Sequence, residues 1–378
     1  MKSLLQFLNE ATITDLETFL NDNGISVDDA LAAIIKYNNS KKGNIKEFTK
    51  FFKSHGLTQL NWGRGNDAIT QFINVFNREN KIDILIEVVE NNGVISIDEL
   101  KTSGNIYDYC KGFEDEAKII CSWLNGTNTP AGQGEILLKF LIKEASTPVE
   151  GDILINPNKL MEVKASTIYG TNKSGGQAAG QKGDIRNAWS IYQYLYENLT
   201  GDSKGNGGYD NFIYFQNTVG FNEFNELLKG LKNIDVRKIT DVLTEAFLYQ
   251  YRFIGEEPKN AAGIDGKTIN ELKDIMFNQL KPIFNEDNTI SKNNEMTLIN
   301  NIGALQLVLY SLIEEFEYFF CILYDKNIEN ESPNNGKYVF LTKEELFDFK
   351  KVLSHLSFGK FASTATKTQG RAGKIFVK

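Results

Sequence analysis

The chain has 378 residues with a hydrophobic content of 41% and an aromatic content of 12%, which exclude a disordered protein and leave room for roughly two or three domains. Three cysteines and two histidines argue against a disulfide framework and a His-rich zinc site, and we expect buried, reduced thiols. The net charge of −8 argues against a protein that coats DNA, but local basic patches on an acidic body suit an enzyme that contacts DNA at one cleft, and equally a protein that docks on other proteins.

Residues 1–11 have the pattern of a short amphipathic helix and are too short and too polar for a secretory signal. They end in Leu8-Asn9-Glu10 and Ala11. This resembles the capsid-targeting peptides of large contractile-tailed phages, in which a short helix ends in Leu-x-Glu and is cut there by a prohead protease. The resemblance implies cleavage after Glu10 and a phage origin, whereas an ordinary first helix is the alternative.

The region from about 1 to 125 is predicted to be mostly helical. An apolar helical face over 82–89 precedes a tight turn, and Ser96 with Glu99 then forms a capping box that favours a further helix. Two helices around this turn could form a helix-turn-helix, so a regulator that binds DNA through residues 81–110 is one hypothesis. Simple packing of two helices is the alternative, and the acidic residues at the start of the second helix favour it.

Residues 126–220 are predicted to form the main functional domain. It begins with a helix that carries Glu135 in its first turn. The apolar stripe of this helix consists of Ile136, Leu137, Phe140 and Leu141. Their spacing places them on one helical face, which we expect to be buried.

A β-hairpin is predicted next along the chain. Two apolar runs, at 153–155 and 160–163, flank Asn156-Pro157-Asn158, whose residue types favour a tight turn. Asp152 precedes the first run, and Glu162 lies within the second. The length of the turn decides whether these two carboxylates share a face of the hairpin.

A three-residue loop pairs Asp152 with Glu162, so that both side chains point to the same face. Lys164, two residues further on, lies on that face as well. A two-residue loop would place Asp152 and Glu162 on opposite faces and abolish the site. The functional hypothesis therefore requires an odd loop, and the alternative is a surface hairpin with solvated charges.

This arrangement can hold a divalent cation. Magnesium prefers oxygen ligands and is usually bound by one or two carboxylates together with waters. Asp152 and Glu162 can supply the carboxylates, and the main-chain carbonyl of Val163 can supply a third ligand for Mg²⁺ or Mn²⁺. Lys164 could orient an attacking water and neutralise a phosphate.

These residues resemble the PD-(D/E)XK nuclease superfamily, although Gly151 stands where the motif has proline. The resemblance implies that Glu135 is an additional acidic site residue and that the protein is a metal-dependent nuclease. A helix near 184–199 and a strand at 211–216 follow the hairpin, which is similar to the αβββαβ core of the superfamily. Only two strands are evident where three are expected. The resemblance implies an α+β or α/β fold with a small mixed sheet.

Two basic segments are predicted to contact DNA. A glycine-rich stretch after the hairpin carries Lys173, Lys182 and Arg186, and a loop near the C-terminus carries Lys367 and Arg371. The C-terminal segment could instead contact an acidic partner, and ordinary solvated loops are the alternative for both segments. The first segment is not a nucleotide-binding P-loop, because glutamine follows the glycine where lysine is required.

The region 221–378 is predicted to be largely helical with a basic tail. The apolar run 302–313 is too short to span a bilayer and indicates a buried helix. The aromatic run 316–324 indicates core, and 375–377 can form a final strand. No internal repeat is evident.

The preferred hypothesis is a phage-encoded, Mg²⁺- or Mn²⁺-dependent DNA endonuclease or exonuclease. The alternative is a structural virion protein of the head, neck or tail that uses a nuclease-like fold as a scaffold. Expected partners are DNA and other virion proteins, with a homo-oligomer left open and no membrane. The expected location is the host cytoplasm, or the virion if the protein is packaged.

Overall fold

In the computed structural model the chain divides into two compact units. Unit 1 comprises Met1–Asn158 with Tyr324–Gly336, and unit 2 comprises Lys159–Leu323 with Lys337–Lys378. The described residues are 87–88, 91–123, 133–146, 148, 151–156, 158–169, 173–174, 177–178, 188–202, 221–231, 233–248, 263–325, 332–361 and 373–378. The three regions predicted from sequence have other boundaries, and this division does not test whether they fold independently.

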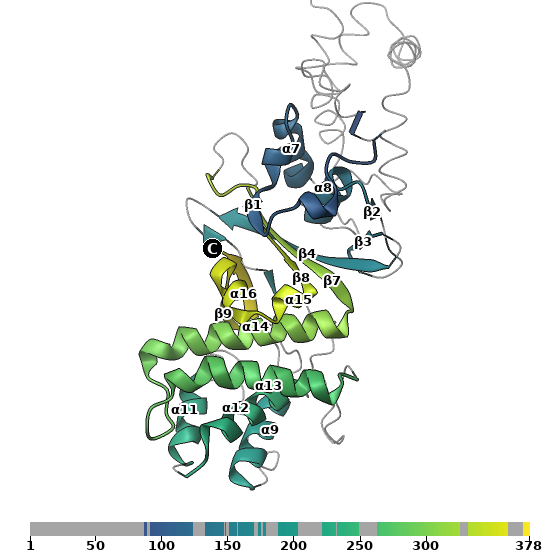
Figure 1. Ribbon diagram of the computed structural model, residues 1–378. Coiled ribbons are helices and arrows are strands. Elements are labelled where there is room, and N and C mark those ends of the chain that lie inside the picture. The colour runs from purple at the N-terminus through teal and green to yellow at the C-terminus, as the bar shows by residue number, and fades with distance from the viewer. Residues whose placement is uncertain are drawn as a thin grey trace, which may run out of the picture. The chain divides into compact units, whose positions relative to one another are not determined.

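Unit 1 combines short helices with short strands (Figure 1). Its elements are η1 (Ile97–Glu99), β1 (Ser103–Asn105), η2 (Ile106–Tyr109), α7 (Glu114–Trp123), α8 (Gln133–Leu141), β2 (Ala145–Ser146) and β3 (Ile153–Ile155). The helix α8 forms where the apolar stripe predicted it, and the described stripe residues Leu137, Phe140 and Leu141 are buried. The ring of Phe140 packs edge to face against the ring of Phe113, with 6.0 Å between the two centroids. Helix α8 therefore packs through this face.

The capping box at Ser96 forms, but the long helix that it was expected to start does not. The main-chain N–H of Ser96 donates to Glu99 at 2.6 Å, and η1 ends after one 3-10 turn because Leu100 adopts extended backbone. Poor helix formers then follow in β1. The prediction of a second helix for the helix-turn-helix in 81–110 is therefore wrong. The helices predicted before residue 87 lie outside the described residues.

Five described strands lie between α8 and α9 (Ala188–Thr200), although the sequence indicated only two. They are β2, β3, β4 (Lys159–Tyr169), β5 (Lys173–Ser174) and β6 (Gln177–Ala178). One of the additional strands, β2, pairs antiparallel with β3 through Ala145 opposite Ile155. A strand of two residues has no alternation to detect, which explains why sequence reasoning missed it. The described order α8-β2-β3-β4-β5-β6-α9 therefore has two more strands before α9 than the predicted αβββαβ core.

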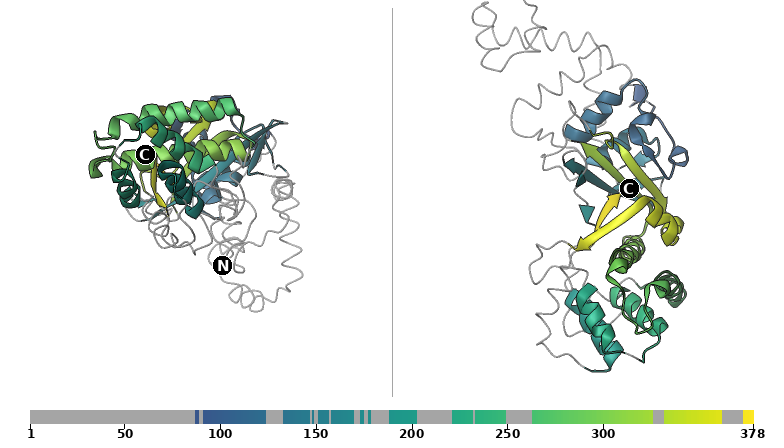
Figure 2. Two further views of the ribbon diagram at one scale, coloured as in Figure 1. Left: turned by 90° about the horizontal axis from the view of Figure 1, so that it is seen from below. Right: turned by 90° about the vertical axis from the view of Figure 1, so that its left-hand side faces the viewer.

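Unit 2 contains most of the helices in the described part of the chain. They are α9 (Ala188–Thr200), α11 (Phe221–Lys229), α12 (Val236–Leu248), α13 (Gly266–Leu280), η4 (Lys281–Ile283), η5 (Lys292–Asn294), α14 (Glu295–Ile313), α15 (Lys343–Leu346) and α16 (Phe349–His355). Helix α12 lies beside α13, and α13 lies beside α14 (Figures 1 and 2). The strand predicted at 211–216 lies outside the described residues.

The strands of unit 2 form two sheets. The described strands are β4 (Lys159–Tyr169), β5 (Lys173–Ser174), β6 (Gln177–Ala178), β7 (Phe316–Asp325), β8 (Lys337–Thr342), β9 (Leu356–Phe361) and β10 (Gly373–Val377). One sheet has the order β8-β7-β4, with β5 also paired with β4, and β7 runs antiparallel to β8. The other has the order β6-β10-β9 with antiparallel pairs. The predicted final strand is confirmed as β10, and the region 221–378 contains strands as well as helices.

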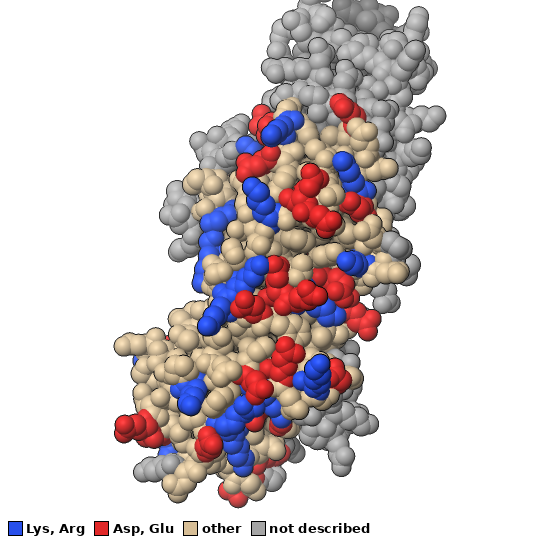
Figure 3. All heavy atoms as spheres, viewed as in Figure 1, with Lys and Arg blue, Asp and Glu red and all other residues tan. Residues whose placement is uncertain are grey.

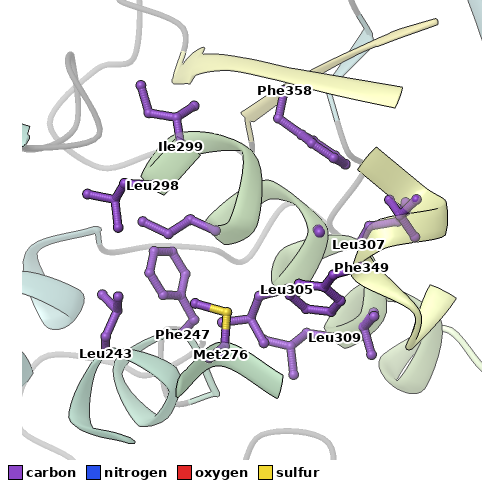
Figure 4. Packing of buried hydrophobic residues seen from close by; sticks show 14 of the residues in the cluster. Leu243, Phe247, Met276, Leu298, Ile299, Leu305, Leu307, Leu309, Phe349 and Phe358 are labelled. Atoms are coloured by element: carbon purple, nitrogen blue, oxygen red, sulfur yellow. The ribbon is translucent and has the colours of Figure 1, made fainter. Parts of the chain in front are cut away.

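The core of unit 2 is built around α14. Figure 4 shows its Leu298, Leu305 and Leu309 among side chains from α12, α13 and α16, such as Phe247 and Phe349. Within the described part of the chain, the stretch Lys292–Ile313 is the one helix long and apolar enough to span a membrane, but 72% of its apolar window is buried. The prediction of a buried helix is thus confirmed, and the chain has the α+β fold that the sequence predicted.

Candidate functional site

Glu162 and Lys164 lie on one face of β4, because side chains two residues apart on a strand point the same way. Leu160 and Ile168, on this same face, pack in the core of unit 2. Glu162 is only 7% exposed. A carboxylate buried to this degree needs hydrogen-bond or charge partners, and the surface-hairpin alternative does not describe this strand.

Two side chains meet the carboxylate of Glu162. The Lys164 ammonium forms an ion pair with its Oε1, with side-chain exposures of 16% for Lys164 and 8% for Glu162. The hydroxyl of Tyr310 donates to the same Oε1 at 2.7 Å. The ammonium also lies 5.6 Å from the centroid of the Tyr310 ring, so the three side chains form a closed triangle.

Tyr310 is held firmly in the core. It lies on α14, is 7% exposed, and its ring meets Phe316 edge-on at 5.3 Å. Sequence reasoning missed it, because 148 residues separate it from Glu162 and no local pattern links the two. On β7, burial raises the pKa of the Cys321 thiol to about 12, against the opposing effect of the Lys164 charge.

Unit 1 holds the other predicted acids. Glu135 is in the first turn of α8, and Asp152 directly precedes β3. Lys139, one helical turn after Glu135, is 3% exposed. Burial lowers the pKa of Lys139, and the charges of Glu135 and Asp152 offset part of this effect. Sequence reasoning missed Lys139, although its spacing of four residues from Glu135 was a usable signal.

The predicted catalytic residues fall in different units. Asp152 and Glu135 belong to unit 1, whereas Glu162, Val163 and Lys164 belong to unit 2. Strand β3 ends at Ile155 and β4 begins at Lys159, so residues 156–158 form the odd-length connection that the hypothesis requires. Asn156 has the left-handed conformation with φ 57°, which asparagine tolerates in turns. The convergence of Asp152 with Glu162 stays a prediction.

The donor set fits an oxygen-preferring cation. Among the described residues, no group of three or more His, Cys, Asp and Glu side chains is placed to hold a metal ion. The predicted set is smaller, with the carboxylates of Asp152 and Glu162 and the carbonyl of Val163. Such a set suits Mg²⁺ or Mn²⁺, which retain several waters when bound by proteins.

The predicted DNA-contacting residues are described only in part. Lys173 lies in β5, opposite Tyr169 of β4. The other residues predicted to contact DNA are Lys182, Arg186, Lys367 and Arg371, and they lie outside the described residues. The predicted cleavage site at Glu10 also lies outside them. These residues therefore stay predictions.

Unit 1 also contains a cavity of about 660 Å³ between η2, the start of α7 and residues 332–335. Two residues that line it are joined by a hydrogen bond of 2.8 Å, from the side-chain amide of Asn105 to the main-chain carbonyl of Asn335. Gly336 has φ 82°, and a Cβ there would overlap Tyr107 and Asn105. The cavity contains none of the predicted site residues.

Comparison with protein-family models, with curated proteins and with solved structures finds no match for this chain. The resemblance to PD-(D/E)XK nucleases therefore stays a prediction from the motif residues. Because a fold alone does not define an activity, the functional argument depends on the chemistry of the site.

Proposed function

We propose that the protein is a divalent-metal-dependent deoxyribonuclease of the PD-(D/E)XK type, encoded by a phage. The observation that carries the proposal is the buried Glu162–Lys164 pair on one face of β4, held by Tyr310. Burying an acid and an amine two residues apart on one face of a strand costs solvation free energy on folding. Such cost is common at functional sites, where charges are needed for chemistry.

The proposed reaction is hydrolysis of a DNA phosphodiester. Asp152, Glu162 and the carbonyl of Val163 would hold the cation. When bound, it supplies Lewis acidity, which makes water a better nucleophile near neutral pH and offsets charge on the phosphate. Lys164 would donate to a phosphate oxygen or orient the water. Water adds to phosphorus, the bond to one sugar oxygen breaks, and that oxygen gains a proton while the water loses one.

The order of elements supports the proposal. Helix α8 carries Glu135, the strands β2, β3 and β4 follow it, and the two-residue strands β5 and β6 precede α9. The first four elements correspond to the αβββ part of the αβββαβ core that the resemblance implies, whereas β5 and β6 are additional. Lys139 adds a buried amine near Glu135 and Asp152, whose charges offset part of the effect of burial on its pKa.

A plasmid-cleavage assay tests the proposal. Purified protein should nick or cut DNA with Mg²⁺ or Mn²⁺, and a chelator should stop the reaction. Lys164→Ala should lower the rate by about 10²-fold or more, because it removes charge stabilisation from the transition state. Lys343→Ala removes a more exposed ion pair, with Glu317 at 3.5 Å, and should leave the rate unchanged. Folded protein that cuts no form of DNA with either metal would refute the proposal.

The second candidate is a structural virion protein, and one observation favours it. The charge of the Glu162 carboxylate is already balanced by Lys164, and Tyr310 donates a hydrogen bond to it, so this strand can be stable without a metal. On the face shown in Figure 3, the described Lys and Arg side chains are interspersed with Asp and Glu. Stoichiometric copies in purified virions, together with no metal binding, would support this candidate over the nuclease.

A further inference from the structure

Among the described residues of unit 2, Glu162 and Glu245 each contact one tyrosine and one lysine, and these two groups, called triads below, use the carboxylate oxygens differently. At Glu245, the hydroxyl of Tyr194 donates to Oε2 at 2.8 Å, and the ammonium of Lys273 pairs with Oε1. At Glu162, Tyr310 and Lys164 both contact Oε1. One triad thus engages both oxygens of its acid, whereas the other concentrates both donors on one oxygen.

The second oxygen of Glu162 is left accessible by this arrangement. Among the described residues, no hydrogen bond or ion pair uses Oε2 of Glu162. Because Oε2 is also not one of the described buried side-chain atoms that lack a partner, it keeps contact with solvent. A carboxylate that needed only internal neutralisation would gain by sharing its donors between both oxygens, as Glu245 does.

We propose that Tyr310 is a positioning residue that fixes the carboxylate of Glu162 so that Oε2 is presented to a divalent cation. The identity of the ligand as a divalent cation rests on the proposed function. The position of the carboxylate rests on the triangle itself. The phenol directs Oε1 toward α14, and its ring holds the ammonium of Lys164 at 5.6 Å from the centroid.

The packing around Tyr310 suits the role of a positioning residue. The ring is fixed by its edge-on contact with Phe316, and α14 is buried along most of its length. A metal ligand held by a rigid partner loses less side-chain freedom when the cation binds. Partners that orient metal ligands typically contribute 10- to 100-fold to metal affinity.

Calorimetric titration of the full-length protein with MnCl₂ tests the proposal without any measurement of activity. Tyr310→Phe keeps the ring and removes only the hydroxyl. It should weaken Mn²⁺ binding by about 10-fold or more. Tyr194→Phe removes the same kind of hydrogen bond at Glu245 and should leave the Mn²⁺ affinity unchanged. Phe316→Leu should weaken binding by a smaller factor, and it provides a second test if Tyr310→Phe does not fold.

The outcomes separate the two proposals. Wild-type protein that binds Mn²⁺ while folded Tyr310→Phe binds it equally well overturns the role of Tyr310 and leaves the nuclease proposal intact. Wild-type protein that binds no Mn²⁺ and cuts no DNA overturns both. Equal weakening by Tyr310→Phe and Tyr194→Phe would indicate a general loss of stability and would also overturn the positioning role.

Discussion

The hydroxyl of Tyr310 donates a hydrogen bond of 2.7 Å to Oε1 of Glu162, and this contact joins the central helix α14 to strand β4. Both residues are 7% exposed. Lys164 completes the group through its ion pair with the same oxygen. Because a buried ion pair costs solvation free energy, its partners are strongly interdependent.

Removal of Lys164 alone should destabilise the protein strongly. Lys164→Met leaves the carboxylate of Glu162 buried without its cation, and we expect the free energy of unfolding to fall by about 3 kcal/mol. Combining it with Glu162→Gln should recover a large part of this loss. Urea denaturation of the wild type, both single variants and the double variant measures the coupling. Additive single effects would contradict the interdependence of this pair.

Stability should depend on pH through Lys139. Because burial lowers the pKa of Lys139 in the folded state, the unfolded state binds more protons between that value and the unfolded pKa of about 10.4. The free energy of unfolding of the wild type, relative to Lys139→Met, should therefore rise as the pH increases toward 10. Its slope is at most about 1.4 kcal/mol per pH unit. Urea denaturation of both proteins over this range measures the difference, and a falling difference would contradict the assignment.

Gly303 should be intolerant of a side chain. A Cβ at this position of α14 would overlap the ring of Phe358. We expect Gly303→Ala to lower the free energy of unfolding by at least about 1 kcal/mol, since overpacking outweighs the gain in helix propensity. Gly266→Ala is the control, because no described atom lies within 4 Å of its added Cβ. Thermal unfolding compares them, and equal stability of the two variants would refute the overlap.

The three free cysteines should be unreactive in the folded protein. Burial raises the pKa of Cys121 and of Cys321 to about 12 and also raises that of Cys110. At pH 8 the thiolate, which is the reactive form, is then scarce. A chromogenic thiol reagent should label none of the three in native protein and all three after denaturation. Rapid labelling of native Cys321 would show that the environment of Lys164 is open.

Much of the candidate site could be predicted from local sequence. The apolar stripe of α8 placed Glu135 in the first helical turn, and the turn residues at 156–158 separated two strands by an odd number. Hydrophobic periodicity and the residue preferences of turns extend over only a few residues, so they can be recognised without knowledge of the fold. The same reasoning failed for β2, because a strand of two residues carries no period.

The sequence by itself determined helix α8, the strands β3 and β4, and that Glu162 and Lys164 share a face of β4. These properties follow from the two-residue repeat of a strand and the 3.6-residue repeat of a helix. Only the tertiary structure decided that Lys139 is buried and that Tyr310 contacts Glu162 from 148 residues away. Burial and long-range contact depend on how elements pack, and local residue patterns do not contain that information.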